Sequence, residues 1–509
     1  MSPEHGLVTA VGAEALRAQV PRQALEMLST GGDLEDEELA RLVLSVHGVG
    51  VLKVLRAALD EKGLEPPREF AGRQKERKWV ADLGFPAEWA GFPARESPAR
   101  EAIEGPVELK PLHDYQIRVT ERIRSLLLGI GRQRGVVSLP TGAGKTRVTI
   151  QALVEEIARG RLAGPILWIA QSEELCEQAA ESWTYVWRAL GPGPMVLGRL
   201  WGPNEVEEEP DGTQVVVATD AKLKSIIDTR SEQYAWLREP TVVIVDEAHT
   251  SVSPTYTSIF DWLGRGAKAT EAKPLIGLTA TPFRGTSDEE TQRLVKRYDS
   301  HLLDDGVLGE DPYRTLREMG VLAHVEKRTL DGATVDFTEA EIDEITNMGR
   351  FPRRREQQLG DDHDRNRRIV ESILDLPDDW PVLLFAPSVE NARALAALLS
   401  HRGVPAVSIS SGTETPARRH YIDQFRKRSI RVLTNYQVLT QGFDAPAVKA
   451  VYVCRPTFSP NVYQQMVGRG LRGTLNGGSE KVLIVDVEDN LSMYGDQLAF
   501  RAFEKLWRQ

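Results

Sequence analysis

The segment LPTGAGKT, residues 139–146, decides the fold of this 509-residue chain. A short apolar run at residues 135–139 leads into it and is typical of a strand, and an i, i+3, i+4, i+7 stripe behind it is typical of a helix. The residues of this stripe are Ile150, Leu153, Val154 and Ile157. A glycine-rich loop between a strand and a helix predicts a phosphate-binding loop, because loop amides and the helix N-terminus attract anions.

Each part of this loop has an expected task. Gly142 and Gly144 let the backbone fold tightly around phosphate oxygens. Lys145 is expected to reach the β- and γ-phosphates, and the Thr146 hydroxyl is expected to bind Mg²⁺. The expected cofactor-binding residues of the loop are Thr141, Gly142, Ala143, Gly144, Lys145 and Thr146. Leu139 stands where the general pattern has its first glycine. The strand–loop–helix context nevertheless favours a phosphate-binding loop over the alternative, an ordinary glycine-rich turn.

Two carboxylates follow a second strand. Residues 241–245 form an almost uninterrupted β-branched run, typical of a buried parallel strand, and Asp246 and Glu247 come directly after it. We expect Asp246 to hold the Mg²⁺ shell while Glu247 polarises the attacking water. The alternative, an acidic loop that caps the next helix, leaves the order of the motifs unexplained.

Two further segments complete an ordered set, LTATPFR at residues 278–284 and QMVGRGLR at residues 465–472. A phosphate-loop match alone is common among unrelated nucleotide-binding proteins, whereas each member of this set supplies a different part that phosphoryl transfer needs. QMVGRGLR lies too far along the chain to belong to the lobe that contains the phosphate loop. The sequence therefore predicts a second lobe.

The ordered segments resemble the motifs of superfamily 2 helicases and translocases of the DEAH type. LHDYQ at residues 112–116 resembles the family's upstream glutamine motif, which implies that Gln116 reads the adenine edge. Four further segments resemble its motifs Ia, Ib, IV and V, at residues 166–178, 215–223, 382–388 and 432–446. The resemblance runs from about residue 109 to the C-terminus. It implies an α/β fold with two RecA-like parallel-sheet lobes in tandem, a nucleic-acid-dependent ATPase activity, and ATP and Mg²⁺ as cofactors.

The resemblance also implies roles for residues outside the phosphate loop. Arg469 and Arg472 would act as arginine fingers on ATP held by the first lobe, since a planar guanidinium can contact two γ-phosphoryl oxygens at once. Gln465 would lie near the γ-phosphate, and Asp444 would contact the ribose or a finger. Two threonines would link the ATP state to contacts between the lobes, Thr279 and Thr281. The alternative for both arginines is a surface position on a helix.

Motif details favour DNA over RNA as the nucleic acid. The chain has DEAH instead of DEAD, TAT instead of SAT, and QMVGRGLR instead of the arginine-rich motif of DEAD-box RNA remodellers. These details are most similar to the restriction-enzyme helicase-subunit group, whose members tend to track along duplex DNA. We therefore expect a DNA translocase or helicase in a DNA-processing, genome-defence or antiviral system, with other protein subunits as partners. The alternatives are an RNA helicase and a catalytically silent nucleic-acid-binding scaffold.

The net charge and the cysteine content agree with a soluble protein that contacts nucleic acid at a few positions. A net charge of −11 argues against a protein that coats polyanions, because such a protein needs a broad basic surface. The two cysteines, Cys176 and Cys454, lie in expected core elements without metal-ligand spacing, and a cytoplasmic location is expected. No apolar stretch approaches the ~20 residues that span a bilayer, and no signal-peptide pattern opens the chain.

The chain length predicts about three domains of ~100–200 residues each. We expect a helical N-terminal domain at residues 1–107, the first lobe at 108–285, a polar linker at 286–311 and the second lobe at 312–509. Aromatic residues alternate with cations between residues 70 and 92. They could stack bases and hold phosphates, but we favour a helical hairpin whose rings pack against a neighbouring domain.

Overall fold

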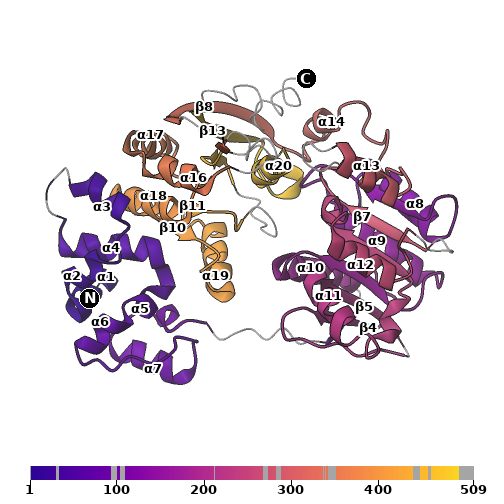
Figure 1. Ribbon diagram of the computed structural model, residues 1–509, viewed down its shortest axis with the longest axis horizontal. Coiled ribbons are helices and arrows are strands. Elements are labelled where there is room, and N and C mark those ends of the chain that lie inside the picture. Colours follow the sequence, from indigo (N-terminus) through magenta and orange to yellow (C-terminus); the bar gives the residue numbers. More distant parts are fainter. Residues whose placement is uncertain are drawn as a thin grey trace. The chain divides into compact units, whose positions relative to one another are not determined.

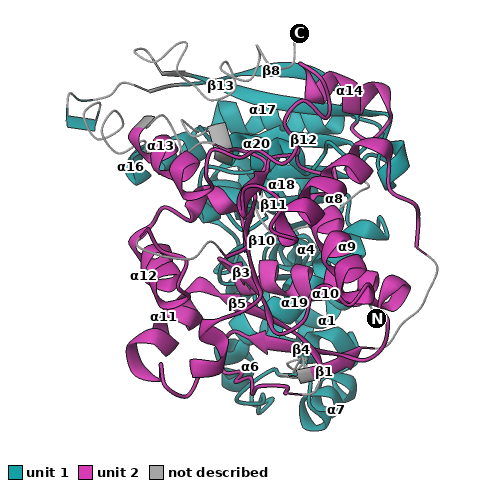
Figure 2. Cartoon of the chain, turned by 90° about the vertical axis from the view of Figure 1, so that its right-hand side faces the viewer, with its two compact units in different colours: residues 1–96, 323–440, 444–508 teal, residues 97–322, 441–443, 509 magenta. Residues whose placement is uncertain are grey.

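The computed structural model describes residues 2–29, 32, 34–92, 100–103, 109–210, 212–267, 273–282, 288–335, 338, 340–341, 351–439, 448–456 and 460–491. Contacts divide the chain into two units (Figures 1 and 2). One contains Ser97–Leu322 and residues 441–443, and the other contains Met1–Glu96, Ala323–Thr440 and Asp444–Arg508. We call the first the phosphate-loop unit and the second the C-terminal unit.

The phosphate-loop unit is built on a seven-stranded sheet with the order β1-β4-β5-β3-β6-β7-β2. Only β1 against β4 is antiparallel. The strands are β1 Arg100–Ile103, β2 Arg134–Val137, β3 Ile166–Ala170, β4 Met195–Leu200, β5 Thr213–Thr219, β6 Val242–Asp246 and β7 Leu275–Leu278. The central strands β3, β5 and β6 are buried along almost their whole length, because helices cover both faces of the sheet.

Side-chain alternation along β3 shows which helices cover which face. Trp168 meets Trp183 of α10 edge-on at 6.4 Å, whereas its neighbours Leu167 and Ile169 share a core with Phe260 of α12 on the other face. Helix α9 packs against both α8 and α10, and α11 packs beside α12 (Figure 1). The helices of this unit are α8 Asp114–Leu127, α9 Lys145–Ala158, α10 Glu173–Leu190, α11 Asp220–Thr229, α12 Pro254–Trp262, α13 Asp288–Arg297 and α14 Pro312–Glu318, with short 3-10 turns at Ala235–Arg238 and Ala248–Thr250.

The described part of the expected linker, residues 288–311, packs against the phosphate-loop sheet and does not form a polar linker. Leu294 of α13 and Tyr298 are buried in the same core as Phe260. The guanidinium of Arg297 lies 5.1 Å from the Phe260 ring. This unit therefore extends to Leu322. The apolar stripe of α13 is narrow and most of the helix is charged, so the sequence pattern did not predict that α13 packs on the core. Residues 100–103, expected in the N-terminal domain, likewise pair with β4.

The C-terminal unit contains a six-stranded, fully parallel sheet with the order β10-β11-β9-β12-β13-β8. Its strands are β8 His324–Val335, β9 Val382–Phe385, β10 Ala406–Ile409, β11 Val432–Asn435, β12 Ala450–Val453 and β13 Lys481–Leu491. Its helices after the N-terminal region are α16 Arg353–Asp361, α17 His363–Leu374, α18 Val389–His401, α19 Thr415–Arg426 and α20 Pro460–Gly468, with a 3-10 turn at Thr474–Asn476.

The N-terminal region is helical, as expected, but it belongs to the C-terminal unit. Helices α3 and α4 pack against α18. The amide of Val49 donates to the Tyr421 hydroxyl of α19 at 2.6 Å. A Cβ on Gly48, whose φ is 50°, would overlap that hydroxyl. The helices are α1 Pro3–Val11, α2 Ala13–Arg17, α3 Arg22–Leu28, α4 Asp36–His47, α5 Val51–Val54, α6 Arg56–Glu61 and α7 Gln74–Asp82, with 3-10 turns at Gly48–Gly50 and Ala87–Ala90.

Most of the aromatic residues between 70 and 92 pack on one another, and Phe92 packs against the neighbouring helix α19, as we favoured for the segment. Phe70 meets Trp79 at 5.9 Å, and Phe85 meets Trp89 at 5.2 Å. Phe92 packs on His420 of α19 at 5.0 Å. The intervening cations Arg73, Lys75, Arg77 and Lys78 are exposed.

The two parallel sheets and the helical N-terminal region confirm the expected fold class. Both cysteines are fully buried, as expected. Among the described helices, none combines the length and the apolar character that crossing a bilayer demands.

Candidate active site

The loop between β2 and α9 has the backbone geometry of a phosphate-binding turn. Gly142 and Gly144 adopt φ values of 86° and 91°, in the left-handed region that side chains disfavour. A Cβ on Gly144 would also lie 2.5 Å from Nε2 of Gln116. Gly144 is the N-cap of α9, so the first amides of this 14-residue helix face the loop. The loop therefore presents helix amides where an anion can bind.

Two neighbouring side chains of α8 donate hydrogen bonds to this loop. The Tyr115 hydroxyl and the Gln116 amide both donate to the carbonyl of Ala143, at 2.7 and 3.1 Å. The Gln116 carbonyl oxygen also accepts the His113 amide at 3.0 Å. Gln116 is only 8% exposed, and burial raises the pKa of Tyr115, so this phenol stays a neutral donor. Tyr115 was missed although it directly precedes Gln116 in LHDYQ. The contact of Gln116 with adenine stays a prediction.

The ammonium of Lys145 lies over its own loop. Its Nζ donates to the Leu139 carbonyl at 2.8 Å and to the Pro140 carbonyl at 3.4 Å. Thr146, the next residue, is half-buried in the first turn of α9. The Lys145 ammonium is therefore bound by carbonyl oxygens of the loop, which bind a cation less strongly than phosphate oxygens do.

Asp246 and Glu247 lie at the end of β6, as the sequence predicts. The Glu247 amide donates to Oδ1 of Asp246 at 3.0 Å, and Glu247 itself has a left-handed φ of 48°. Burial, with the charge of Glu247, raises the pKa of Asp246 to about 7, although the positive charge of Lys145 opposes the shift. A divalent cation would favour the ionised carboxylate here.

The donor set fits Mg²⁺ that is shared with a phosphate ligand. No group of three His, Cys, Asp or Glu side chains within the described residues could hold a metal ion. Mg²⁺ in phosphoryl-transfer sites commonly takes one or two protein oxygens, and phosphates and waters complete its shell. The Asp246 carboxylate and the Thr146 hydroxyl are oxygen donors of that kind.

A polar chain continues from Glu247 through His249 to the LTATPFR segment. Nδ1 of His249 lies 3.3 Å from Oε2 of Glu247 and 3.0 Å from Oγ1 of Thr279. The Thr279 hydroxyl donates to the Thr281 carbonyl at 3.0 Å and accepts the Thr281 amide at 3.1 Å. The chain thus joins the ends of β6 and β7. His249 was missed as a functional residue, although it is the last letter of VDEAH.

The expected residues of QMVGRGLR belong to the C-terminal unit. Gln465 lies on α20 and is 8% exposed, and Arg469 and Arg472 follow that helix and are half-buried. Gly470 fixes this segment on its sheet, because a Cβ there would lie 2.8 Å from Val482. Asp444 and Arg284 lie outside the described residues.

The structure therefore brings one set of expected residues together. The phosphate loop, Gln116, Asp246 and Glu247 all belong to the phosphate-loop unit, where the charge of Lys145 acts on Asp246. Gln465, Arg469 and Arg472 form a second set, on and just after α20.

Comparisons with known proteins match both units. Residues 109–284 match the type III restriction enzyme, res subunit family, and residues 365–474 match the helicase conserved C-terminal domain. The putative ATP-dependent helicase IRC3 of Saccharomyces cerevisiae is 27% identical over 359 residues, which cover 67% of this chain and 47% of IRC3. The chain spans roughly half to two thirds of the length of the first curated relatives that it matches.

Two solved structures share the fold. The ATP-dependent type ISP restriction-modification enzyme LlaBIII bound to DNA has a TM-score of 0.52 and 16% identity, and the match covers 75% of this chain and 28% of LlaBIII. A variant of S. cerevisiae Dbp5 bound to RNA and ADP BeF3 has a TM-score of 0.50 and 16% identity, over 78% of this chain and 92% of Dbp5. The two solved structures show the fold alone, whereas the two family matches, together with the ordered motifs, show that the chain belongs to the superfamily 2 helicases.

Proposed function

We propose that this chain hydrolyses ATP in a nucleic-acid-dependent reaction and uses the energy to move along DNA, with duplex DNA as the favoured track. Its setting would be a DNA-processing or genome-defence system in which other subunits carry out any modification or cleavage. The observation that carries the DNA assignment is the match of residues 109–284 to the restriction-enzyme res subunit family. The fold alone does not separate the two tracks, because LlaBIII bound to DNA and Dbp5 bound to RNA both share it.

The phosphate-loop unit would bind ATP. Lys145 would exchange the Leu139 and Pro140 carbonyls for the β- and γ-phosphates, whose negative charge attracts an ammonium more strongly. Residues 141–144 would offer amides to the same phosphates, and Gln116 would read the adenine edge. The Thr146 hydroxyl and the Asp246 carboxylate would hold Mg²⁺. When bound, this cation neutralises charge that develops on the transferred phosphoryl group.

Glu247 would act as the general base of hydrolysis. Its left-handed backbone turns it away from the direction of β6, and its carboxylate stays close to the imidazole of His249. A carboxylate held in this way can orient a water molecule and accept its proton. Thr279 is hydrogen-bonded to His249, and Thr281 is hydrogen-bonded to Thr279. These two threonines would link the state of the base to contacts between the lobes.

The C-terminal unit would complete the reaction. Arg469 and Arg472 would stabilise the charge spread over the γ-phosphoryl oxygens, with Gln465 near the same group and Asp444 at the ribose or at a finger. Since these residues come from a different unit, hydrolysis would require the two lobes to close.

The chain would contact the nucleic acid mainly through hydroxyls and amides at helix N-termini. Ser172, two residues after β3, and Thr219, the last residue of β5, cap α10 and α11 with their hydroxyls. Hydroxyls and amides at helix N-termini bind backbone phosphates without reading base sequence. This type of contact needs few cations and is compatible with a net charge of −11.

ATPase assays with duplex DNA, single-stranded DNA and RNA, each at several salt concentrations, test the proposal. Duplex DNA should stimulate turnover at least as well as single strands and clearly better than RNA, and stimulation should weaken as salt rises. Displacement of a third strand from a triplex, without separation of a forked duplex, would identify a translocase. Stimulation by RNA alone would replace the proposal with the RNA helicase alternative, and a chain without ATP turnover would be a scaffold.

A further inference from the structure

The chain leaves the phosphate-loop unit alongside the strand that leads into the phosphate loop. The amide of Val136 donates to the His301 carbonyl, and its carbonyl accepts the Leu303 amide, both at 2.8 Å. Residues 301–303 thus extend the sheet beyond β2, which is its edge strand. We call residues 301–322 the exit segment, because Ala323 is the first residue after it and belongs to the C-terminal unit.

Asp304 fastens the exit segment to the residue that precedes LPTGAGKT. The amide of Ser138 donates to Oδ1 of Asp304 at 2.6 Å, and the Ser138 hydroxyl donates to Oδ2 at 3.0 Å. Burial raises the pKa of Asp304, while both bonds to Ser138 and the charge of Lys145 oppose the shift. The Asp304 carboxylate is therefore a partly desolvated group that uses both of its oxygens on one residue.

The next residue after Ser138 ties this contact to the phosphate loop. The carbonyl of Leu139 is the closer acceptor of the Lys145 ammonium, at 2.8 Å. A continuous series of bonds therefore runs from Asp304 through Ser138 and Leu139 to Lys145. A change in the partner of Lys145 acts on the Leu139 peptide, which is covalently joined to Ser138.

A second anchor holds the exit segment to the helix behind the loop. Nη1 of Arg122 donates to the carbonyls of Leu303 and Asp305, at 3.3 and 2.7 Å. Arg122 lies on α8, the helix whose Tyr115 and Gln116 hold the Ala143 carbonyl. The exit segment is therefore attached to both elements that shape the phosphate loop. Two of its side chains reach the strand side of the loop: the His301 ring contacts the Arg134 carbonyl at 3.0 Å, and Asp304 binds Ser138, the residue next to the loop.

We propose that Asp304 is a positioning residue that couples the nucleotide state of the phosphate loop to the exit segment, and so to the C-terminal unit. When ATP draws Lys145 away from Leu139, the Leu139 and Ser138 peptides readjust, and the paired bonds of Asp304 carry this readjustment into residues 301–322. Coupling between sites travels through such contiguous networks of bonds. The proposal rests on the proposed binding of ATP but not on the choice of DNA as track.

Hydrogen exchange with nucleotide alone tests the coupling directly. In the wild-type chain, Mg²⁺ with a non-hydrolysable ATP analogue should slow exchange both in residues 138–148 and in the exit segment. In Asp304→Ala the loop should still be protected, while the nucleotide-dependent change in the exit segment should be lost. Asp305→Ala is the matched control, because Asp305 is exposed and its described contact uses the backbone carbonyl, which the substitution keeps.

Two further variants keep the test decisive if Asp304→Ala folds poorly. Asp304→Asn retains an oxygen acceptor for the Ser138 amide and should retain coupling. Ser138→Ala removes only the hydroxyl bond and should weaken the change in the exit segment without abolishing it. Equal protection of the exit segment in wild type and Asp304→Ala would overturn the proposal. Absence of any loop protection in the wild type would instead refute the proposed ATP site.

Turnover offers a second readout. Asp304→Ala should reduce the ratio of nucleic-acid-stimulated to basal kcat by about 5- to 150-fold, the usual range for coupling between sites, and change KM for ATP much less. Asp305→Ala should keep the wild-type ratio. A variant that raises KM for ATP but keeps its stimulation ratio would show that Asp304 only supports the loop, and would contradict the proposed coupling.

Discussion

His249 Nδ1 lies 3.0 Å from the Thr279 hydroxyl oxygen, and this contact joins the segment after β6 to the segment after β7. The same nitrogen lies 3.3 Å from the Glu247 carboxylate. Because Nδ1 carries at most one proton, a strong bond to one partner weakens the bond to the other. His249 can therefore link the state of the proposed base to that of the threonine.

This arrangement predicts strong coupling between His249 and Thr279. His249→Ala and Thr279→Ala should each lower nucleic-acid-stimulated kcat, and the double variant should lose little more than the worse single variant. The coupling energy should be about 0.5–1.5 kcal/mol, the usual net value of one hydrogen bond. A double-mutant cycle on stimulated kcat measures it. Fully additive losses would show that the contact carries no functional coupling.

Substitutions of Lys145 and Glu247 should impair ATP hydrolysis in different ways. Lys145→Ala should abolish turnover and weaken ATP binding, because it removes the cation of the phosphate loop. Glu247→Gln should keep ATP binding and lose hydrolysis, because the amide cannot accept the proton of water. Binding of a fluorescent ATP analogue and steady-state turnover separate the two effects. Turnover of Glu247→Gln at the wild-type rate would refute the base assignment.

The arginines after α20 should act mainly in the transition state. Arg469→Ala and Arg472→Ala should each lower kcat by roughly 10³–10⁵-fold, the range known for arginine fingers, and change ATP affinity much less. Nucleic-acid stimulation should disappear with kcat. Single-turnover kinetics at saturating ATP measures this effect. A variant that loses affinity but keeps the maximal rate would place its arginine in ground-state binding instead.

Local sequence patterns explain why the positions of the phosphate loop and the carboxylates in the fold could be predicted. The phosphate loop and the carboxylates depend on contiguous residues, and their places after β2 and β6 follow from the apolar runs before them. Asp304 gave no such signal, because a pair of aspartates between short apolar runs matches no functional motif. Its partner Ser138 lies 166 positions earlier in the chain.

The domain boundaries were also difficult to predict from the sequence, because they depend on contacts between distant residues. The apolar stripe of α13, with Leu294, is too narrow to stand out among its charged residues. The docking of the N-terminal helices depends on contacts such as Val49 with Tyr421, which are 372 positions apart. A helical pattern identifies the buried face of such a domain but not the surface that covers it.

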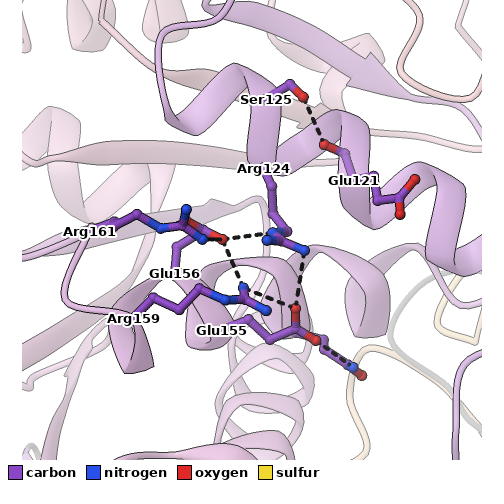
Figure 3. A network of polar contacts seen from close by, with 8 residues as sticks. Glu121, Arg124, Ser125, Glu155, Glu156, Arg159 and Arg161 are labelled. Carbon is purple, nitrogen blue, oxygen red and sulfur yellow. Dashed lines mark hydrogen bonds and ion pairs between the residues drawn. The ribbon is translucent and has the colours of Figure 1, made fainter.

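A buried carboxylate stabilises the pair of helices behind the phosphate loop. Glu156 of α9 is 1% exposed and meets Arg124, Arg159 and Arg161 at 2.7, 2.9 and 2.8 Å (Figure 3). Arg124 lies on α8, so this network ties together the helix that carries Gln116 and the helix that begins at Lys145.

Glu156→Gln should destabilise the protein because three cations then lose their shared partner. The loss should be about 1.5–3 kcal/mol, the range of a hydrogen bond to a charged group. It should stay below the 3–5 kcal/mol typical of a broken, fully buried pair, since the arginines reach water. Glu155→Gln is the matched control, because Glu155 is 25% exposed and its ion pairs are longer, at 3.4 and 3.8 Å. Urea unfolding measures both. Equal losses would contradict the role of burial.

The docking surface of the N-terminal helices should make the C-terminal unit sensitive to acid. His47 ends α4, and its carbonyl accepts the Tyr421 hydroxyl at 3.4 Å. Burial lowers the pKa of His47, and the charge of Arg393 on α18 lowers it further, while the bond to the Gln19 carbonyl opposes the shift. The folded state thus binds this proton less readily than the unfolded state does.

It follows that stability is lost as the pH falls from the unfolded-state pKa of His47, about 6.5, toward its lower folded-state value. His47→Gln keeps an amide donor for the Gln19 carbonyl and removes the titration, so its Tm should fall less between pH 7.5 and pH 5.5 than that of the wild type. His5→Gln, at an exposed position, should keep the wild-type pH dependence because it retains His47. Thermal unfolding across this pH range measures the difference. A His47→Gln variant with the wild-type dependence would show that another group governs the acid sensitivity.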